Sequence, residues 1–463
     1  MGNGLISSLA AKWLTGRMLS GVLFGVLLTV AASLPFSVAW AESPRLELLL
    51  DAEVDDYING LAAPVLKAAD LSPENVHVLV LNSPEINAFV NSQHTIFMFS
   101  GLLLEAENSN EVLGVIAHEV GHLKGHHLLR LSETRDELTF PTIVGGLLGL
   151  GAVIAGAPQA GSAVLLGSQA AGISSFLRFS RSQEQQADQI AVNLLDDLNA
   201  STEGLKNFFG RLSVQSQMYH QAPPEYLMTH PKPSGRENFL EQAALRPYTP
   251  TPADVKAFKR TQAKVLALTH SPGQTRRLMF DRDDGFADYA RAIAFFRAGE
   301  FAEARQSLQS TAEKLKLSKD PYLTEIKAHM ALEKGDTTKA EALYREALSY
   351  KPDSTLIRYH YGRTLLVNNK TEPAIAQLER VLQRHGQWWM AHQQLGLAYG
   401  KNDQKTAAHI HLAQAALYSG NLEDAGFHIE IAAQTLSGTD TKKQAQQKQT
   451  INLLKRELEK LQN

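Results

Sequence analysis

Residues 108–122 read NSNEVLGVIAHEVGH. Asn108 stands three residues before Glu111, an arrangement typical of a helix start. The apolar residues that follow recur at the spacing of one helix face: Val112, Val115, Ile116 and Val120. The stretch therefore predicts a helix with one buried side.

Two histidines of this helix can act together. His118 and His122 are four residues apart, so both imidazoles lie on one face and can reach one metal ion. Glu119 is turned by about 100° and lies beside that ion. The H-E-x-x-H spacing is typical of peptidases in which zinc polarises the scissile carbonyl and a glutamate takes the proton of the attacking water. We predict one Zn²⁺ per chain with Glu119 as general base; the alternative is a chance pattern on a helix with exposed histidines.

The third zinc ligand is not a nearby histidine. Metzincins place their third histidine six residues after the second, where this chain has Leu128, so that class is excluded. His126 is two helical turns from His118 and cannot converge on the same ion. We therefore expect His126 and the adjacent His127 to be solvated.

An acidic segment further along the chain can supply the third ligand of the metal site. Residues 180–188 read SRSQEQQAD, and Glu184 is the predicted third ligand of a gluzincin-type centre. Asp188, one turn further on, can accept the other ring N–H of a ligating histidine. The alternative is an exposed acidic pair.

Three short runs before the motif helix predict strands. They are β-prone and separated by turn residues, at 77–81, 86–90 and 95–99, and they predict a small antiparallel sheet. An extended substrate could add as a further strand to the edge formed there, which includes Asn87, Ala88 and Phe89.

The composition argues against nucleic-acid binding and against metal sites that use cysteine. The 463 residues are 44% hydrophobic and 20% charged, which suits a globular chain of two or three domains. A net charge of −3 gives no attraction toward nucleic acid. Because there is no cysteine, a metal must be held by nitrogen and oxygen.

Two apolar segments, one at the N-terminus and one within the chain, bear on whether the protein is exported and whether it contacts a membrane. Residues 1–41 have a basic start, an apolar run and a small-x-small end, which predicts a cleaved signal peptide and a periplasmic location; an uncleaved anchor is the alternative. The predicted peptidase domain is 42–266. Within it, 140–177 has no charged residue and predicts an apolar helical hairpin that packs on the core, contacts a membrane surface or spans it.

The C-terminal part is repetitive. Similar turn-then-alanine features end at Ala304, Ala340, Ala374 and Ala407, at intervals of 36, 34 and 33 residues. This period predicts tetratricopeptide repeats over 285–436, after a linker at 267–284, with a capping helix at 437–463. The predicted fold class is α+β and mostly helical, namely a gluzincin-type metallopeptidase domain with a small sheet, followed by an α-solenoid.

Four spaced motifs together resemble one metallopeptidase family. They are Asn87-Ala-Phe89, the H-E-V-G-H helix, residues 180–188, and Thr229-His-Pro231 followed by Arg236. Their order is similar to that in the family that includes the prenyl-protein endopeptidases. The resemblance implies zinc ligands at His118, His122 and Glu184.

The same resemblance also has implications beyond the three ligands. It places His230 and Arg236 near the active site, where they would stabilise the oxyanion, or where His230 would occupy the fourth zinc position and hold the enzyme off. It also implies partners among misfolded or assembling outer-membrane proteins and their assembly machinery, recruited through the repeats.

Two functions remain open at this point. One is a quality-control endopeptidase. The other is a chaperone or assembly scaffold that works through the repeats, with proteolysis restrained. Non-catalytic zinc storage would make the presence of Glu119 accidental.

Overall fold

The computed structural model describes most of the chain. The described residues are 47–91, 95–127, 181–218, 226, 230, 236–243, 246–436 and 441–462; within these, the side chains of 213–218 and 236–238 are not described. The predicted signal peptide and the apolar segment 140–177 lie outside the described residues, as does Leu128. Within the described part of the chain, no helix is both long and apolar enough to cross a membrane.

A four-stranded sheet forms one layer of the first domain. Its strands are β1 (Glu47–Leu48), β2 (His77–Asn82), β3 (Ala88–Val90) and β4 (Thr95–Phe99), in the order β1-β2-β4-β3. The three predicted strands are present, but the prediction of an antiparallel sheet was wrong because β2 and β4 are parallel. The chain returns through β3, which pairs antiparallel to β4 at the sheet edge.

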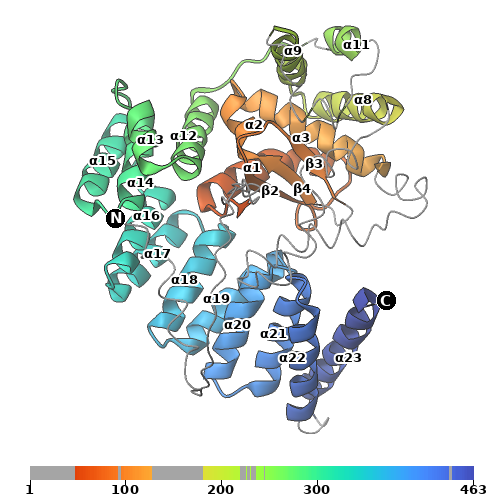
Figure 1. Ribbon diagram of the computed structural model, residues 1–463, viewed down its shortest axis with the longest axis vertical. Helices are drawn as coiled ribbons and strands as arrows, with labels where there is room; N and C mark the ends of the chain where they lie inside the picture. The colour runs from red at the N-terminus through yellow and green to blue at the C-terminus, as the bar shows by residue number, and fades with distance from the viewer. Residues whose placement is uncertain are drawn as a thin grey trace, which may run out of the picture. The chain divides into compact units, whose positions relative to one another are not determined.

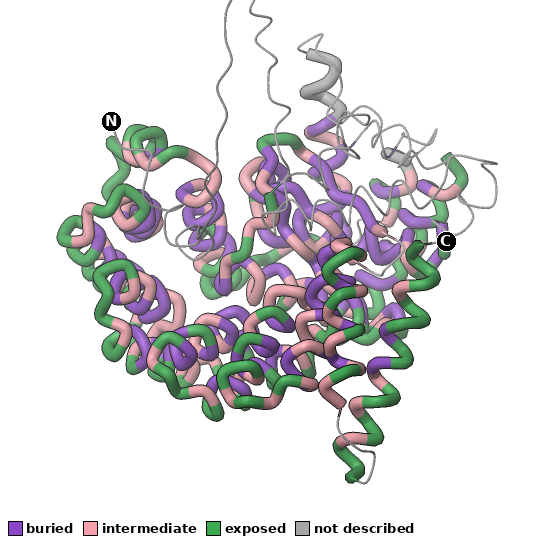
Figure 2. The backbone as a smooth tube through the Cα atoms, turned by 60° about the horizontal axis from the view of Figure 1, so that its bottom comes forward, coloured by how far each residue is buried: buried purple, intermediate pink, exposed green. Residues whose placement is uncertain are grey.

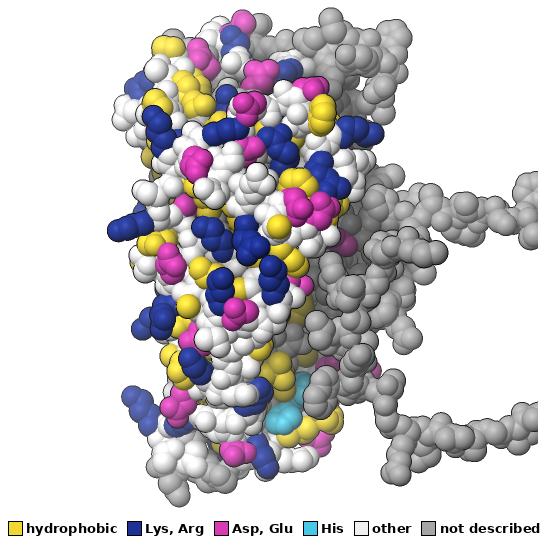
Figure 3. Space-filling model, turned by 90° about the vertical axis from the view of Figure 1, so that its left-hand side faces the viewer, with side chains coloured by type: hydrophobic (Ala, Val, Ile, Leu, Met, Phe, Trp, Pro, Cys, Tyr) yellow, Lys and Arg dark blue, Asp and Glu magenta, His cyan; other side chains and the backbone are white. Residues whose placement is uncertain are grey.

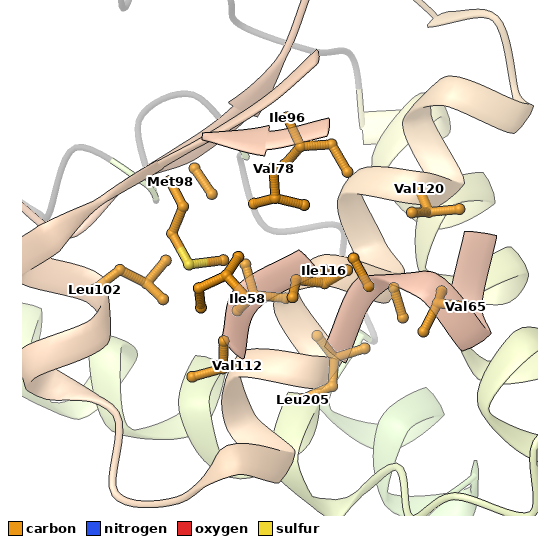
Figure 4. Close-up of a cluster of buried hydrophobic side chains, with 14 of the residues drawn as sticks. Ile58, Val65, Val78, Ile96, Met98, Leu102, Val112, Ile116, Val120 and Leu205 are labelled. Carbon is orange, nitrogen blue, oxygen red and sulfur yellow. The ribbon is translucent and has the colours of Figure 1, made fainter. Parts of the chain in front are cut away.

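Two helices pack on this sheet. They are α1 (Ala52–Ala68) and α3 (Ser109–Lys124), which carries the H-E-x-x-H motif. Figure 4 shows their apolar side chains meeting those of the strands, with Ile58 of α1 and Ile116 of α3 at the centre. Val112, Ile116 and Val120 are fully buried, so the apolar stripe read from the sequence is the core-facing side of α3.

Among the described residues, the domain has four further helices, of which α8 and α9 pack against α3. They are α2 (Ser100–Glu105), α8 (Arg181–Asp197), α9 (Glu203–Met218) and α11 (Arg236–Ala243). Glycines allow two close approaches. A Cβ atom at Gly114 would lie 2.7 Å from the backbone nitrogen of Leu205 in α9, and one at Gly121 would lie 2.6 Å from the carbonyl oxygen of Ala187 in α8. The two glycines of the motif helix therefore set how near α8 and α9 can come.

Helix α12 (Pro252–Thr269) belongs to two cores at once. Thr251 caps it in a reciprocal capping box with Asp254, and Pro252 occupies its first turn. Phe258 and Val265 contribute to the core of the sheet domain, whereas Ala263 and Ala267 contribute to the core of the first repeat. After α13 (Pro272–Leu278) the repeats begin. The two regions thus share a helix.

The repeats are successive antiparallel helix pairs, coloured green to blue in Figure 1. Each pair turns through a residue with positive φ, namely Gly299, Gly335, Asn369 and Asp403. Figure 2 shows buried positions on the inner sides of the helices and exposed ones along the outer turns. The pairs are α14 (Gly285–Arg297) with α15 (Phe301–Lys314), α16 (Pro321–Glu333) with α17 (Thr337–Tyr350), α18 (Thr355–Val367) with α19 (Thr371–Arg384), and α20 (Trp389–Lys401) with α21 (Lys405–Tyr418).

The array ends by reusing a helix. α21 packs against both α20 and α22 (Leu422–Thr435), which accounts for the shortened spacing in the sequence. α23 (Lys442–Gln462) then covers the last pair with Ile451 and Leu454, which are buried. The tetratricopeptide-like architecture is therefore as predicted.

The outer face of the repeats carries mixed charges. In Figure 3, Lys and Arg side chains are interspersed with Asp and Glu and with apolar groups, over the helices at the left of Figure 1. Mixed charge of this kind keeps a helical surface soluble without creating a field of one sign.

Candidate metal centre

The motif helix holds three of the candidate residues in place. Its first turn is capped by the side chain of Asn108, which accepts a hydrogen bond from the backbone N–H of Glu111 at 3.1 Å, as the sequence predicted. His118, Glu119 and His122 follow on this helix and are 0%, 0% and 1% exposed. The alternative of exposed motif histidines is therefore wrong.

Helix α8 supplies two further groups. Glu184 and Asp188 lie one turn apart on its buried side, and both are essentially inaccessible to solvent. The close approach at Gly121 brings this part of α8 against α3. The alternative of an exposed acidic pair is also wrong, because both carboxylates face the motif histidines.

Four ligand atoms converge on one point. His118 Nε2 lies 3.1 Å from His122 Nε2 and 3.4 Å from His230 Nδ1, and the carboxylate oxygens of Glu184 lie 3.1–3.4 Å from these three nitrogens. Ligand atoms around a tetrahedral ion with bonds of about 2.0–2.1 Å are about 3.3 Å apart. The buried nitrogen-and-oxygen donor set thus has the dimensions of a metal site.

The other nitrogen of each motif histidine has a defined partner. His118 Nδ1 lies 2.9 Å from Asp188 Oδ1. His122 Nδ1 lies 2.9 Å from His127 Nδ1, and His127 Nε2 lies 3.1 Å from Gln186 Oε1. Because the Gln186 oxygen can only accept, His127 donates from Nε2 and accepts at Nδ1. His122 therefore donates from Nδ1, which leaves its Nε2 lone pair facing the site.

The prediction for His127 was wrong. His126 is exposed, as expected, but His127 is fully buried between α3 and α8. His126 adopts a positive φ of 51°, and this turn at the end of α3 directs the next side chain back toward His122. A simple count of helical turns could not show this, because the helix ends before His127.

Tyr226 was missed by the sequence reasoning. Its hydroxyl donates a hydrogen bond to Glu119 Oε1 at 3.2 Å, and its ring stacks on His230 with centroids 4.4 Å apart. Its position four residues before His230, in the same segment, was the available signal. Glu119 Oε2 is buried with no hydrogen-bond partner among the described residues, so it remains available for a water or a substrate group.

The electrostatics of the site favour a cation at its centre. Burial opposes charge on His118, but Asp188 and Glu184 outweigh it and raise its pKa to about 9. Burial alone would raise the pKa of Glu184, yet the neighbouring histidines His230, His122 and His118 hold it well below its usual value. Burial keeps the pKa of His122 well below 6.5, so this ring is neutral and can bind a metal.

Burial lowers the pKa of a histidine, but it raises the pKa of a carboxyl group such as that of Glu119. It raises the pKa of Glu119 above 4.5, despite the lowering influence of His230 and His118. A carboxylate with a raised pKa is a better proton acceptor near neutral pH.

The sheet edge lies directly beside these residues. β3 is the last strand of the sheet, and Ala88 and Phe89 are buried. The carbonyl oxygen of Ile86 accepts from the backbone N–H of Tyr226 at 3.1 Å, and that of Ala88 lies 3.2 Å from His230 Nε2. Asn87 instead accepts from Phe99 of β4. Tyr226 and His230 therefore occupy the carbonyl groups of Ile86 and Ala88 at this edge.

For Arg236, the structure describes the backbone only. Arg236 begins α11, but its side chain lies outside the part that the structure describes. Its predicted role near the site stays a prediction.

The sequence matches models of two known protein families. The model of peptidase family M48 matches residues 49–244, which include α3 and α8. This region is a peptidase family M48 domain. M48 peptidases are metal-dependent, and the buried cluster of His118, His122, Glu184 and His230 could hold a metal ion within the matched region. A tetratricopeptide-repeat model matches 331–395, within the helix pairs that follow the M48 domain.

The chain is also similar to curated proteins. The chain is 26% identical over 392 residues to the beta-barrel assembly-enhancing protease of Yersinia pestis, covering 82% of this chain and 79% of the relative. It is 30% identical over 273 residues to the protein of that name from Escherichia coli K12, covering 57% and 55%. A mitochondrial metalloendopeptidase of Bos taurus is 27% identical over 213 residues, covering 44% and 40%.

These matches confirm the predicted resemblance. The first half of the chain is a metallopeptidase domain of the M48 type, and repeats follow it. The match to the Escherichia coli relative spans just over half of that protein's length.

Proposed function

We propose that this protein is a zinc-dependent endopeptidase of the periplasm, acting in quality control and assembly of outer-membrane proteins. The observation that supports this most is the buried group of four ligand atoms beside Glu119. The donor set of imidazole nitrogens and one carboxylate oxygen suits zinc. The substrate class is taken from the names of the relatives.

The proposed roles follow from the contacts. His118, His122 and Glu184 hold the ion, and bound zinc would supply Lewis-acid polarisation of the scissile carbonyl and acidify a water molecule. Glu119 takes a proton from that water and returns it to the leaving amine. Tyr226 holds Oε1 of Glu119 in place, which directs Oε2 toward the reacting groups. Asp188 and His127 fix the orientation of the two motif histidines.

Substrate would bind as an added strand on β3. An extended segment pairing there would need the carbonyl groups of Ile86 and Ala88, whose present partners are in the segment 226–230. His230 also fills the fourth ligand position. We therefore propose that this segment withdraws before cleavage, so that the peptidase is restrained at rest. Arg236, at the start of α11, would then act near the same site.

The repeats are the proposed recruitment surface. Stacked helix pairs present extended surfaces for proteins, and the relatives' names point to partners in outer-membrane protein assembly. Export by residues 1–41 and membrane-surface contact by 140–177 belong to the same proposal. No nucleic-acid partner is proposed.

A scaffold acting through the repeats is the second candidate, because the contacts of His230 with Glu184 and with the carbonyl of Ala88 would restrain proteolysis. Glu119→Gln separates the two functions. It should retain zinc while reducing cleavage of an unfolded protein such as casein by about 10²-fold or more. Glu74→Gln, at an exposed position, is the matched control.

The same variant gives a cellular test. In cells that lack the native protein, the endopeptidase proposal predicts that Glu119→Gln fails to restore outer-membrane protein assembly. Full restoration by this variant would establish the scaffold function instead. Unchanged casein cleavage by the purified variant would remove Glu119 from the mechanism.

A further inference from the structure

A second group of metal-binding side chains lies within the repeats. Glu325 and His329 are one turn apart on α16, and His360 lies on α18 of the next helix pair. One ligand atom from each residue falls within 4.8 Å of the others. None of these residues belongs to the M48 domain, and the proposed peptidase mechanism uses none of them.

The distances are close to those of a metal site. His329 Nε2 lies 3.6 Å from Glu325 Oε1. The rings of His329 and His360 have centroids 4.8 Å apart and are nearly perpendicular, at 81°. Ligand atoms around zinc are about 3.3 Å apart. The pair on α16 is therefore nearly in position, and a ring nitrogen of His360 lies within 4.8 Å of both ligand atoms.

A buried tyrosine orients both imidazoles. The hydroxyl of Tyr344 lies 2.9 Å from His329 Nδ1, and its ring stacks on His360 at an angle of 18°. When His329 donates from Nδ1 to this hydroxyl, its Nε2 lone pair faces Glu325. Metal-binding histidines commonly have their second nitrogen held in this way.

The surrounding charges leave an excess of negative charge. Glu325 is one of four carboxylates in a largely buried ionic network that has two cations, so that its formal charge is −2 (four negative, two positive). The members are Asp51, Glu53, Asp320 and Glu325 with Arg260 and Lys264. A buried network is most stable when its charges balance, and a divalent cation would supply the difference.

Glu325 is the weakly paired member of this network. Its Oε2 atom is buried without a hydrogen-bond partner among the described residues, and Lys264 Nζ is 4.0 Å away. Arg363 is the competing cation next to His360, but its side chain is exposed and lies over Tyr359. His329 is 29% exposed, which provides a path for an ion to enter.

We propose that Glu325, His329 and His360 form a second zinc site, separate from the centre at His118. An ion there would link two consecutive repeats. Through Glu325 it would also reach the ionic network that includes Asp51 and Glu53 at the start of α1. The chain would then hold two zinc ions, one for chemistry and one that fixes the repeats.

Zinc stoichiometry tests this proposal on the full chain. After equilibration with buffered zinc and removal of excess, the native protein should hold two equivalents by elemental analysis. His360→Gln and His329→Gln, made separately, should each hold one and keep peptidase activity. His118→Gln should also hold one, by loss of the other ion. His270→Gln, a histidine at the end of α12, should hold two.

The absorption spectrum of bound cobalt is a second measurement of the proposed site, and it does not depend on the folding of a single variant. Cobalt added to His118→Gln should give the visible absorption bands of a four-coordinate site, and a Glu325→Gln replacement in that background should abolish them. Circular dichroism would check that each variant is folded. One equivalent in the native protein, or two in folded His360→Gln, would overturn the proposal.

Discussion

His122 Nδ1 lies 2.9 Å from Nδ1 of His127, and this contact fixes which nitrogen of His122 faces the metal centre. His127 in turn is held by Gln186 of α8. The end of the motif helix and the helix that carries Glu184 are thus joined through two imidazole rings.

Replacing His127 should therefore weaken metal binding. In His127→Ala the partner of His122 is lost, and we expect the affinity for zinc to fall by about 10- to 100-fold. Competition with a chromophoric chelator measures this directly. His126→Ala changes the exposed neighbour and should bind zinc as the native protein does. Equal affinities of the two variants would show that the contact has no influence on the metal.

Replacing His230 should release the peptidase. His230→Ala removes both the fourth ligand atom and the contact with the carbonyl of Ala88. We expect casein cleavage to rise about fivefold or more, since removal of an inhibitory contact of about 1 kcal/mol has that effect. Adding Glu119→Gln should abolish the gain. Lost cleavage would instead assign His230 a role in stabilising the reaction, and unchanged cleavage would contradict both roles.

Gly121 should not tolerate a side chain. The Cβ atom of Gly121→Ala would lie 2.6 Å from the carbonyl oxygen of Ala187, which is backbone and cannot move without α8. We expect a loss of about 1–3 kcal/mol in the free energy of unfolding, together with weaker zinc binding because Glu184 moves. Gly60→Ala, where nothing lies within 4 Å in α1, should be neutral or stabilising by up to about 1 kcal/mol. Denaturant unfolding and metal titration would distinguish them.

The histidines of the repeats should make stability depend on pH. Burial lowers the pKa of His385 and His411 to about 3 and that of His392 to about 4. Because the unfolded chain takes up protons near pH 6.5 and the folded chain does not, acid favours unfolding. The contribution of these three histidines to stability should be constant above pH 7 and fall between pH 6.5 and 4, by up to about 2 kcal/mol per histidine at pH 5.

Thermal melting at several pH values measures this dependence. Replacing the hydrogen-bonded pair His392 and His411 by glutamine should flatten the curve below pH 6.5. A melting temperature that stays the same from pH 8 to pH 5 would be inconsistent with the burial of these rings.

Much of the site could be predicted from local spacing. The capped helix at Asn108 and the paired histidines rest on residues within one or two helical turns, where geometry is fixed by the helix itself. The choice of Glu184 rests instead on the gluzincin pattern, in which a second segment supplies a glutamate. The repeat period likewise depends on local turns, which the structure shows at Gly299, Gly335 and later positions.

What the sequence could not predict depends on tertiary contacts. The parallel pairing of β2 with β4 is set by the path of the chain through β3. The alternation of apolar and polar residues in a strand does not indicate the direction of its neighbour. His127 is buried because the helix ends at Gly125 and the chain turns back. Tyr226 meets Glu119 only because its segment crosses the sheet edge.

The bonds from segment 226–230 to Ile86 and Ala88 have one more consequence. An unpaired strand at the end of a sheet is a template for any extended chain, including another copy of the same protein. By occupying these acceptors, Tyr226 and His230 oppose self-association. Under the proposed function, in which the enzyme meets unfolded β-strands, the same two contacts would keep its own sheet from becoming a seed for their aggregation.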